Sequence, residues 1–139
     1  MANVAAVSGV REILANLAER NKRMAAGANR GLRLAGLLLQ RESQRIVPVN
    51  FGVLKNSAFT RATGDGFKTE VNVGYTASYA MFVHENVEMK LRGLPRQGKG
   101  AKGKYWDPQG RGQAKFLEEP ARRLGPAMKK IILDNTRII

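Results

Sequence analysis

The sequence predicts an α+β fold in which two long helices pack on a small antiparallel sheet that contains a β-hairpin. Apolar residues recur at helical spacing in the first third of the chain and again near its end, while the middle alternates apolar and polar residues. These blocks follow one another without repeats, which is typical of helices that cover one small sheet. With 139 residues, 43% of them hydrophobic, one domain over residues 1–139 is expected.

The first helix is expected over residues 8–46. Its apolar side chains recur every three or four positions, at Val10, Ile13, Leu14, Leu17, Met24, Ala28, Leu32, Ala35, Leu39 and Ile46. Ser8 can cap its start, and Pro48 ends it. Glycine in a helix interior costs about 1 kcal/mol relative to alanine. A kink or a close helix contact is therefore predicted at Gly27, Gly31 and Gly36, and two helices in tandem fit the pattern equally well.

The middle of the chain is predicted to form the sheet. Two strands, Ser57–Thr63 and Phe67–Tyr75, flank the turn sequence Gly64-Asp65-Gly66, which predicts a β-hairpin. The short stretch 79–83 is expected to be a helical turn. Its side chains expected to be buried against the hairpin are Tyr79, Phe82 and Val83. A further half-buried strand is expected at Val87, Met89 and Leu91.

The last third of the chain predicts a loop and a helix. Residues 93–112 are rich in glycine, include two prolines and have no continuous apolar period, so we expect a long mobile loop. A helix is expected over Phe116–Ile139, with Pro120 tolerated in its first turn. Gly125-Pro126 should kink this helix or split it into two.

The charge is strongly basic and concentrated in one segment. The chain has 24 Lys and Arg against 11 Asp and Glu, a net charge of +13, which favours polyanionic partners. Residues 87–115, called the basic segment below, hold eight basic and two acidic residues. Flexible cations contact phosphates as point charges, without reading bases. The candidate contacts with DNA or a partner are Lys90, Arg92, Arg96, Lys99, Lys102, Lys104, Arg111 and Lys115; an acidic protein surface or no partner at all are the alternatives.

The residue types argue against catalysis. The chain has no cysteine, which excludes disulfides, thiolate zinc sites and thiol catalysis, and its one histidine, His84, has no second histidine to share a metal. The stretch 98–103 matches G-x-G-x-x-G literally, yet no strand precedes it and no helix follows it. We therefore predict no enzymatic activity, no catalytic, metal or cofactor-binding residues, and no cofactor. No apolar stretch approaches the ~20 residues of a membrane span, so no membrane partner is expected.

Three stretches resemble one family. Val47–Ser57 resembles the "V-P-V-D-T-G-x-L-x-x-S" segment of the tail-completion, or neck, proteins of tailed double-stranded DNA bacteriophages, although Asn50-Phe51 replaces Asp-Thr. Tyr79–Glu85 resembles their "Y-A-x-x-V-E-x-G", and Lys115–Ala121 their closing "F-L-x-P-A", in the same order over roughly residues 8–135. These are the first, second and third stretches below. The residues singled out as the structural motif of these stretches are Pro48, Gly52, Leu54, Tyr79, Phe82, Glu85, Phe116, Leu117 and Pro120; at His84-Glu85-Asn86 the glycine that usually follows the acid is missing.

The residues of these stretches also have a physical interpretation. Pro48 stops the first helix, Gly52 permits the turn toward the sheet, and Leu54 and Phe116 are expected core anchors. The resemblance implies a virion structural protein that forms a homo-oligomeric ring, expected to be a hexamer, which joins the head connector to the tail and lines or gates the DNA passage. It implies connector, adaptor and tail proteins as partners, with nonspecific contact to double-stranded DNA. It places the chain in the neck of the virion, and in the host cytoplasm during virus assembly.

A different class of function stays open on charge alone, a free nonspecific nucleic-acid-binding protein. No zinc finger, RNP motif or basic zipper supports it.

The C-terminal helix carries apolar residues around most of its circumference, more than one core can cover. A subunit interface is therefore predicted at Ile131, Ile132, Ile138 and Ile139.

Overall fold

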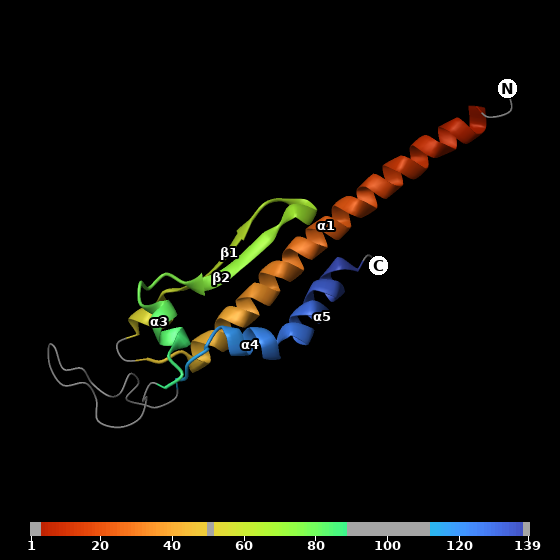
Figure 1. Ribbon diagram of the computed structural model, residues 1–139. Coiled ribbons are helices and arrows are strands. Elements are labelled where there is room, and N and C mark those ends of the chain that lie inside the picture. Colours follow the sequence, from red (N-terminus) through yellow and green to blue (C-terminus); the bar gives the residue numbers. More distant parts are fainter. Residues whose placement is uncertain (1–3, 50–51, 89–111, 138–139) are drawn as a thin grey trace.

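One long helix organises the fold (Figure 1). The computed structural model describes residues 4–49, 52–88 and 112–137, and their α+β architecture confirms the predicted fold class. Helix α1 spans Val4–Ile46, about 65 Å at 1.5 Å per residue. After it come α2 (Val53–Asn56), β1 (Ala58–Thr63), the 3-10 turn η1 (Gly66–Lys68), β2 (Glu70–Tyr75), α3 (Ala80–Glu85), α4 (Glu118–Arg123) and α5 (Gly125–Thr136).

Helix α1 is continuous through Gly27, Gly31 and Gly36, so the tandem arrangement does not occur. It ends two residues before Pro48, as predicted. The prediction that Ser8 caps its start is wrong, because the helix begins at Val4 and Ser8 lies inside it. The residues Ala5 and Ala6 explain the earlier start, since alanine is the best helix former.

Three glycines of α1, Gly27, Gly31 and Gly36, allow close packing. A Cβ added at Gly27 would collide with the backbone carbonyl of Asn135, and one at Gly31 would lie 2.8 Å from the Cα of Ile132. Helix α5 therefore lies directly on the backbone of α1 and runs antiparallel to it. Gly36 does the same for the sheet, because a Cβ there would lie 2.7 Å from the Cγ1 of Val71.

The hairpin forms as predicted but with a different turn. Strands β1 and β2 pair antiparallel, with Thr60 opposite Val73. The prediction that Phe67 begins the second strand is wrong, since Phe67 lies in η1 and is 65% exposed. Gly66 has φ +57°, and its N–H donates to Oδ1 of Asp65 at 2.8 Å, which curls the chain into a 3-10 turn and delays the strand to Glu70.

The C-terminal helix is split, as Gly125-Pro126 predicted. Helices α4 and α5 meet at Leu124, and Pro126 falls in the first turn of α5, where its missing N–H costs nothing. Pro120 is buried in the first turn of α4. The second long helix of the predicted architecture is thus two shorter ones, of which α5 packs on α1.

Two predictions around the basic segment have different outcomes. The strand predicted from Val87 does not start there, because Val87 and Glu88 form a turn; Met89 and Leu91 lie outside the described residues. Of the loop predicted at 93–112, all but Gly112 lies outside the described residues as well.

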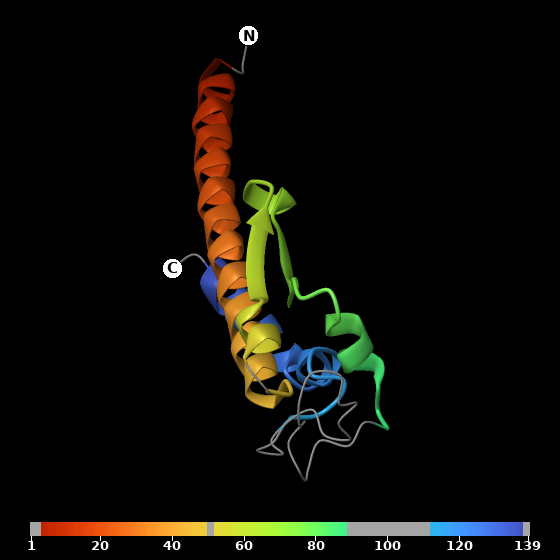
Figure 2. The same cartoon turned by 90° about the vertical axis from the view of Figure 1, so that its left-hand side faces the viewer.

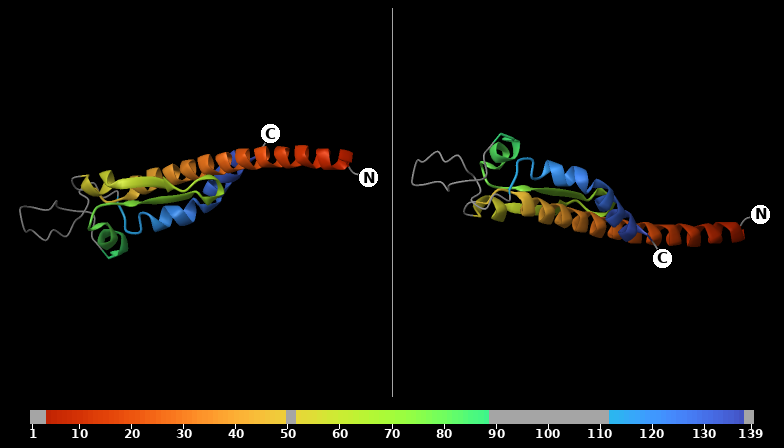
Figure 3. Two further views of the ribbon diagram at one scale, coloured as in Figure 1. Left: turned by 90° about the horizontal axis from the view of Figure 1, so that it is seen from above. Right: turned by 90° about the horizontal axis from the view of Figure 1, so that it is seen from below.

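The N-terminal part of α1 extends beyond the rest of the fold (Figures 2 and 3). The tip of the hairpin reaches α1 at Ala25, where a Cβ on Gly66 would lie 3.7 Å from the Cβ of Ala25. The end of α5 reaches α1 at Gly27. Residues 9–23, called the overhang below, precede both contacts, and every residue from 10 to 23 is exposed.

Replacing Gly27 by alanine is expected to lower the free energy of unfolding by up to about 2 kcal/mol. The new methyl group would overlap the backbone of α5, and this overpacking outweighs the gain of about 1 kcal/mol in helix propensity. Gly9→Ala is the matched control, because nothing lies within 4 Å of a Cβ at that position, and it should be neutral or stabilising. Urea unfolding followed by circular dichroism checks this. Equal stabilisation by both substitutions would contradict the close packing of α5 on α1.

Candidate functional site

The three stretches that carry the family resemblance meet in one buried cluster. The first stretch contributes Val47 and Leu54, the second contributes Val83, and the third contributes Phe116. Each is between 1% and 5% exposed, and together they form the core at the C-terminal end of α1. Leu54 and Phe116 are therefore core anchors, as predicted.

Phe116 is the centre of this cluster. The rings of Tyr75 and His84 both meet it edge-on, with centroids 5.1 and 5.0 Å away. The Tyr75 hydroxyl lies 2.7 Å from Oγ of Ser43, a fully buried side chain of α1. Burial raises the pKa of Tyr75, and the hydrogen bond with Ser43 opposes this in part. The sheet, α1 and α3 are thus tied to one aromatic ring.

Several other matching residues occupy the predicted places. Pro48 and Pro120 are buried, and Leu117 is half-buried against the cluster. Gly52 has φ +81° and precedes the first residue of α2, a conformation that favours glycine. These residues shape the chain around the core.

Tyr79 and Phe82 are not buried against the hairpin, so this prediction is wrong. They are 42% and 58% exposed. The inward face of α3 consists of Ala80 and Val83, which are three residues apart and both pack on the cluster. Tyr79 and Phe82 have the same spacing but are rotated by one residue, about 100° around the helix, which turns them outward.

A cluster of polar side chains, called the junction below, holds together the two points of the chain between which the basic segment lies. We define it as His84, Glu85, Lys115 and Glu118. The backbone N–H of Lys115 donates to the carbonyl of His84 at 2.7 Å, and Lys115 adopts φ +56°, which is unusual for a residue with a side chain. Its ammonium group pairs with Glu85, and with Oε2 of Glu118 at 3.1 Å.

The histidine of this junction has defined roles for both ring nitrogens. The backbone N–H of Glu118 donates to Nε2 at 3.2 Å, so Nε2 is the acceptor and the ring proton sits on Nδ1. Nδ1 in turn lies 2.8 Å from Oε1 of Glu85, to which it donates. His84 therefore links α3 to the start of α4.

Charge pairing shifts two pKa values within the junction. Hydrogen bonds from Lys115 and then His84 lower the pKa of Glu85 below 4.5. Hydrogen bonds to Glu85 and then Glu118 raise the pKa of Lys115 above 10.5. Both shifts favour the charged forms, so the pair is complete at neutral pH.

The candidate contact residues are divided by what the structure describes. Lys115 lies in the junction with two carboxylate partners, and its contact with DNA or a partner stays a prediction. The other seven cations of the basic segment, Lys90, Arg92, Arg96, Lys99, Lys102, Lys104 and Arg111, lie outside the described residues. A backbone hydrogen bond of 2.8 Å from Gln113 to the carbonyl of Ile46 fixes the returning chain to the end of α1.

Two absences hold for residues 4–49, 52–88 and 112–137. Nowhere in these ranges do three or more His, Asp or Glu side chains gather as metal ligands would. Among the helices within them, none combines the length and the apolar character that crossing a bilayer requires.

The overhang carries an apolar stripe. The sequence pattern predicted its residues as part of the apolar face of the first helix, but not that they are exposed. Val10, Ile13, Leu14 and Leu17 are 50–59% exposed, and we call them the bare stripe. Periodicity identifies such a face but not what covers it. Four exposed aliphatic residues at spacings of three and four on one helix are a candidate contact surface.

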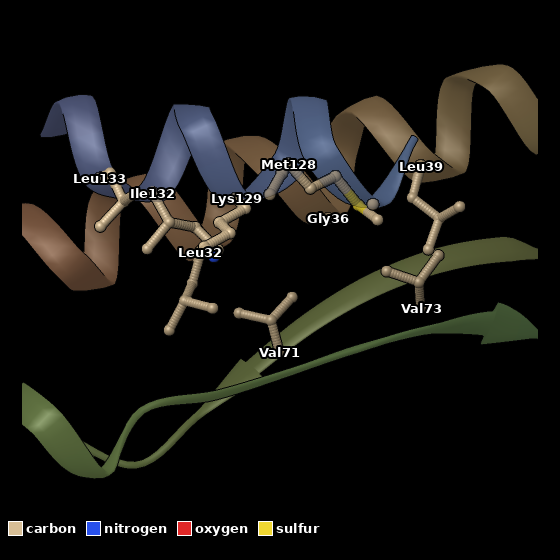
Figure 4. A pocket seen from close by; sticks show the side chains of 11 residues that line it. Leu32, Gly36, Leu39, Val71, Val73, Met128, Lys129, Ile132 and Leu133 are labelled. Carbon is tan, nitrogen blue, oxygen red and sulfur yellow. The ribbon is translucent and has the colours of Figure 1, made fainter. Parts of the chain in front are cut away.

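A second apolar surface lies between α1, β2 and α5 (Figure 4). It is an open groove of about 390 Å³, called the apolar groove below. Its lining residues are Leu32, Ala35, Gly36, Leu39, Val71, Val73, Gly125, Met128, Lys129, Ile132 and Leu133. Of the predicted subunit interface, Ile132 thus lines a groove, Ile131 is half-buried, and Ile138 and Ile139 lie outside the described residues.

Glu85→Gln is expected to destabilise the protein in a pH-dependent way. Because the pKa of Glu85 is lowered on folding, its carboxylate adds stability above about pH 4.5, and this is lost as the pH falls through the folded-state pKa. Lys115 adds stability below its unfolded pKa near 10.5 and loses it as the pH rises through the raised value. The difference from wild type should therefore be largest near neutral pH and vanish toward acid pH.

Urea unfolding midpoints at about pH 7 and about pH 3 measure this difference. Glu88→Gln, an exposed carboxylate three residues along, is the control and should change little at either pH. A loss of stability in Glu85→Gln that is the same at both pH values would contradict the ion pair as its source.

The comparisons with known proteins returned no match. No family model fits the chain, and neither a curated protein nor a solved structure is significantly similar to it.

Proposed function

We propose that this chain is a structural subunit of the neck of a tailed double-stranded DNA bacteriophage. Its copies form a ring, hexameric as in the family it resembles, that joins the head connector to the tail and lines or gates the DNA passage. The protein acts by assembly and carries out no reaction.

The observation that carries this proposal is the convergence of the three resembling stretches on one core. Val47 and Leu54, Val83, and Phe116 come from segments far apart in sequence and are in contact in the buried cluster. The apolar positions of all three stretches thus serve one core, as the motifs of a single fold are expected to do. The convergence supports a shared fold, and the order of the three stretches along the chain extends the proposal to a shared role.

Two further properties of the chain suit a subunit of a DNA conduit. The bare stripe and the apolar groove leave aliphatic surface uncovered within the described residues, which favours contacts with other chains. The basic segment adds a net charge of +6, and the junction holds its two ends side by side at the C-terminal end of α1. Eight cations within one short segment of sequence would attract the phosphates of passing DNA without regard to base sequence.

Mass spectrometry of purified phage particles tests the proposal directly. The chain should be present at a fixed copy number, and electron microscopy of a reconstituted connector should place it as a ring between connector and tail. A phage that lacks the gene should accumulate filled heads that have no tails. Absence of the chain from purified particles would end the proposal. Monomeric protein that binds DNA tightly, encoded away from portal and tail genes, would favour the free nucleic-acid-binding protein instead.

Changing Lys99, Lys102 and Lys104 to alanine is expected to weaken the salt dependence of DNA binding. Each neutralised phosphate contributes about 0.9 to the slope of log K against log salt, so the slope should fall by up to about 3 per engaged subunit. Sequence preference should stay unchanged, since point charges on phosphates carry no base readout. Fluorescence anisotropy of labelled duplexes at several salt concentrations measures the slope.

The matched control replaces three exposed lysines outside the basic segment, Lys22, Lys55 and Lys68, by alanine. It removes the same charge and should keep a slope close to that of wild type. If the first variant keeps its slope while ring assembly weakens, the basic segment binds a neighbouring protein and not DNA.

A further inference from the structure

The bare stripe continues a face of α1 that is covered elsewhere. Leu32 follows Leu14 by 18 residues, about five full helical turns, so the two side chains point in the same direction from the axis. The same spacing relates Leu17 to Ala35. Leu32 and Ala35 form part of the floor of the apolar groove, while Leu14 and Leu17 lie on the overhang. Two apolar segments therefore lie on the same side of α1, the first bare and the second at the bottom of a groove, with the polar residue Asn21 between them.

The apolar groove is built to receive an aliphatic ridge. Val71 and Val73 of β2 form one wall, and Met128 and Ile132 of α5 form the other, with Leu32 on the floor between them (Figure 4). The volume of about 390 Å³ corresponds to roughly a dozen waters. Water beside such a lining finds few hydrogen-bond partners, so replacing it with apolar side chains is favourable.

The two surfaces of one copy are unable to meet. Leu14 and Leu32 are separated by about 27 Å along one continuous helix, so the bare stripe stays away from its own groove. They are fixed at different heights on the same rigid element. A contact between them must join two copies, and because ridge and groove are different surfaces, each copy keeps one of each for further partners.

We propose that the bare stripe of one copy lies in the apolar groove of a second copy of this chain. The alignment of the stripe with the packed face of α1 supports this occupant, since the stripe would then be flanked by α5 and β2 of the second copy as Leu32 and Ala35 are flanked in their own copy. Only the closing of such contacts into a ring rests on the proposed function. A head-to-tail contact of this type produces rings when its rotation closes.

The size of the contact sets its strength. The overhang is about 22 Å long and a helix with side chains about 10 Å wide, so one contact is smaller than the roughly 800 Å² per partner of a standard interface. Each copy in a ring makes the contact twice. The copies also repel one another, with +13 on each, so added salt should strengthen the contact. A partner held by its negative charge would instead be released by salt.

Cysteine cross-linking tests the proposal. Because the chain has no native cysteine, only the introduced thiols can react. Leu14→Cys and Leu133→Cys both alter exposed side chains, one in the bare stripe and one in the apolar groove. Mixed at up to about 1 mM and treated with a short thiol cross-linker, the two variants should give a covalent dimer. Each variant alone should stay monomeric, and the double variant should give a ladder of oligomers.

Ala15→Cys is the matched control, because Ala15 is an exposed residue of the overhang about 150° around the helix from the middle of the bare stripe. Mixed with Leu133→Cys it should cross-link at least tenfold less. Leu17→Cys repeats the test at a second position of the bare stripe, and the yield should rise with salt in each productive mixture. Circular dichroism confirms that every variant is folded.

Three outcomes would overturn the proposal. A dimer from Leu14→Cys alone would show that bare stripes pair with each other. Equal cross-linking yields from Ala15→Cys and Leu14→Cys would show that the two copies meet only by random collision and form no specific contact. No dimer from either stripe cysteine at the highest concentration would show that the groove does not accept the stripe. Cross-linking in a chain that is absent from phage particles would refute only the neck assignment, whereas a chain present in particles without this cross-link would refute only the contact.

Discussion

The close approach of α5 to α1 is the constraint on which the rest of the structure depends. Gly27 and Gly31 have no side chain, so the backbone of α5 rests on that of α1 near Asn135 and Ile132. A single methyl group there would push α5 outward. Because α5 is also one wall of the apolar groove, this displacement would change the width of the groove. Gly36 sets the opposite wall in the same way, by admitting Val71 of β2.

Local chemistry made much of the fold predictable from sequence. Pro48 marks the end of α1, Gly64-Asp65-Gly66 marks the hairpin, and Gly125-Pro126 marks the division between α4 and α5. Each acts within a few residues through a missing N–H or a positive φ. Phe116 and Leu54 could be assigned to the core because Phe and Leu are among the residue types most often buried.

Features that depend on distant contacts were less predictable. An apolar period shows that a helix has an apolar face, but not whether another element covers that face. It therefore did not distinguish the exposed Leu14 from the half-buried Leu32 on the same helix. Tyr79 and Phe82 are aromatic residues of a kind often found in cores. Tyr79 immediately precedes α3 and Phe82 lies in it, and this helix is too short to bury more than one side. The junction gave no sequence signal beyond charge, because Lys115 reaches Glu85 only once the chain has returned from the basic segment.

The continuity of α1 has a consequence for how this chain can change over time. Each residue inserted between the overhang and the groove rotates the bare stripe by about 100° relative to the groove floor, while seven residues together rotate it by about 20° and shift it by about 10 Å. Single insertions would therefore turn the stripe out of phase, and only changes near whole turns would keep both surfaces on one side. The length of α1 between the stripe and the groove therefore fixes both the distance between these surfaces and their relative orientation around the helix axis. Two chains with different α1 lengths would not be interchangeable in one assembly, even with identical surfaces.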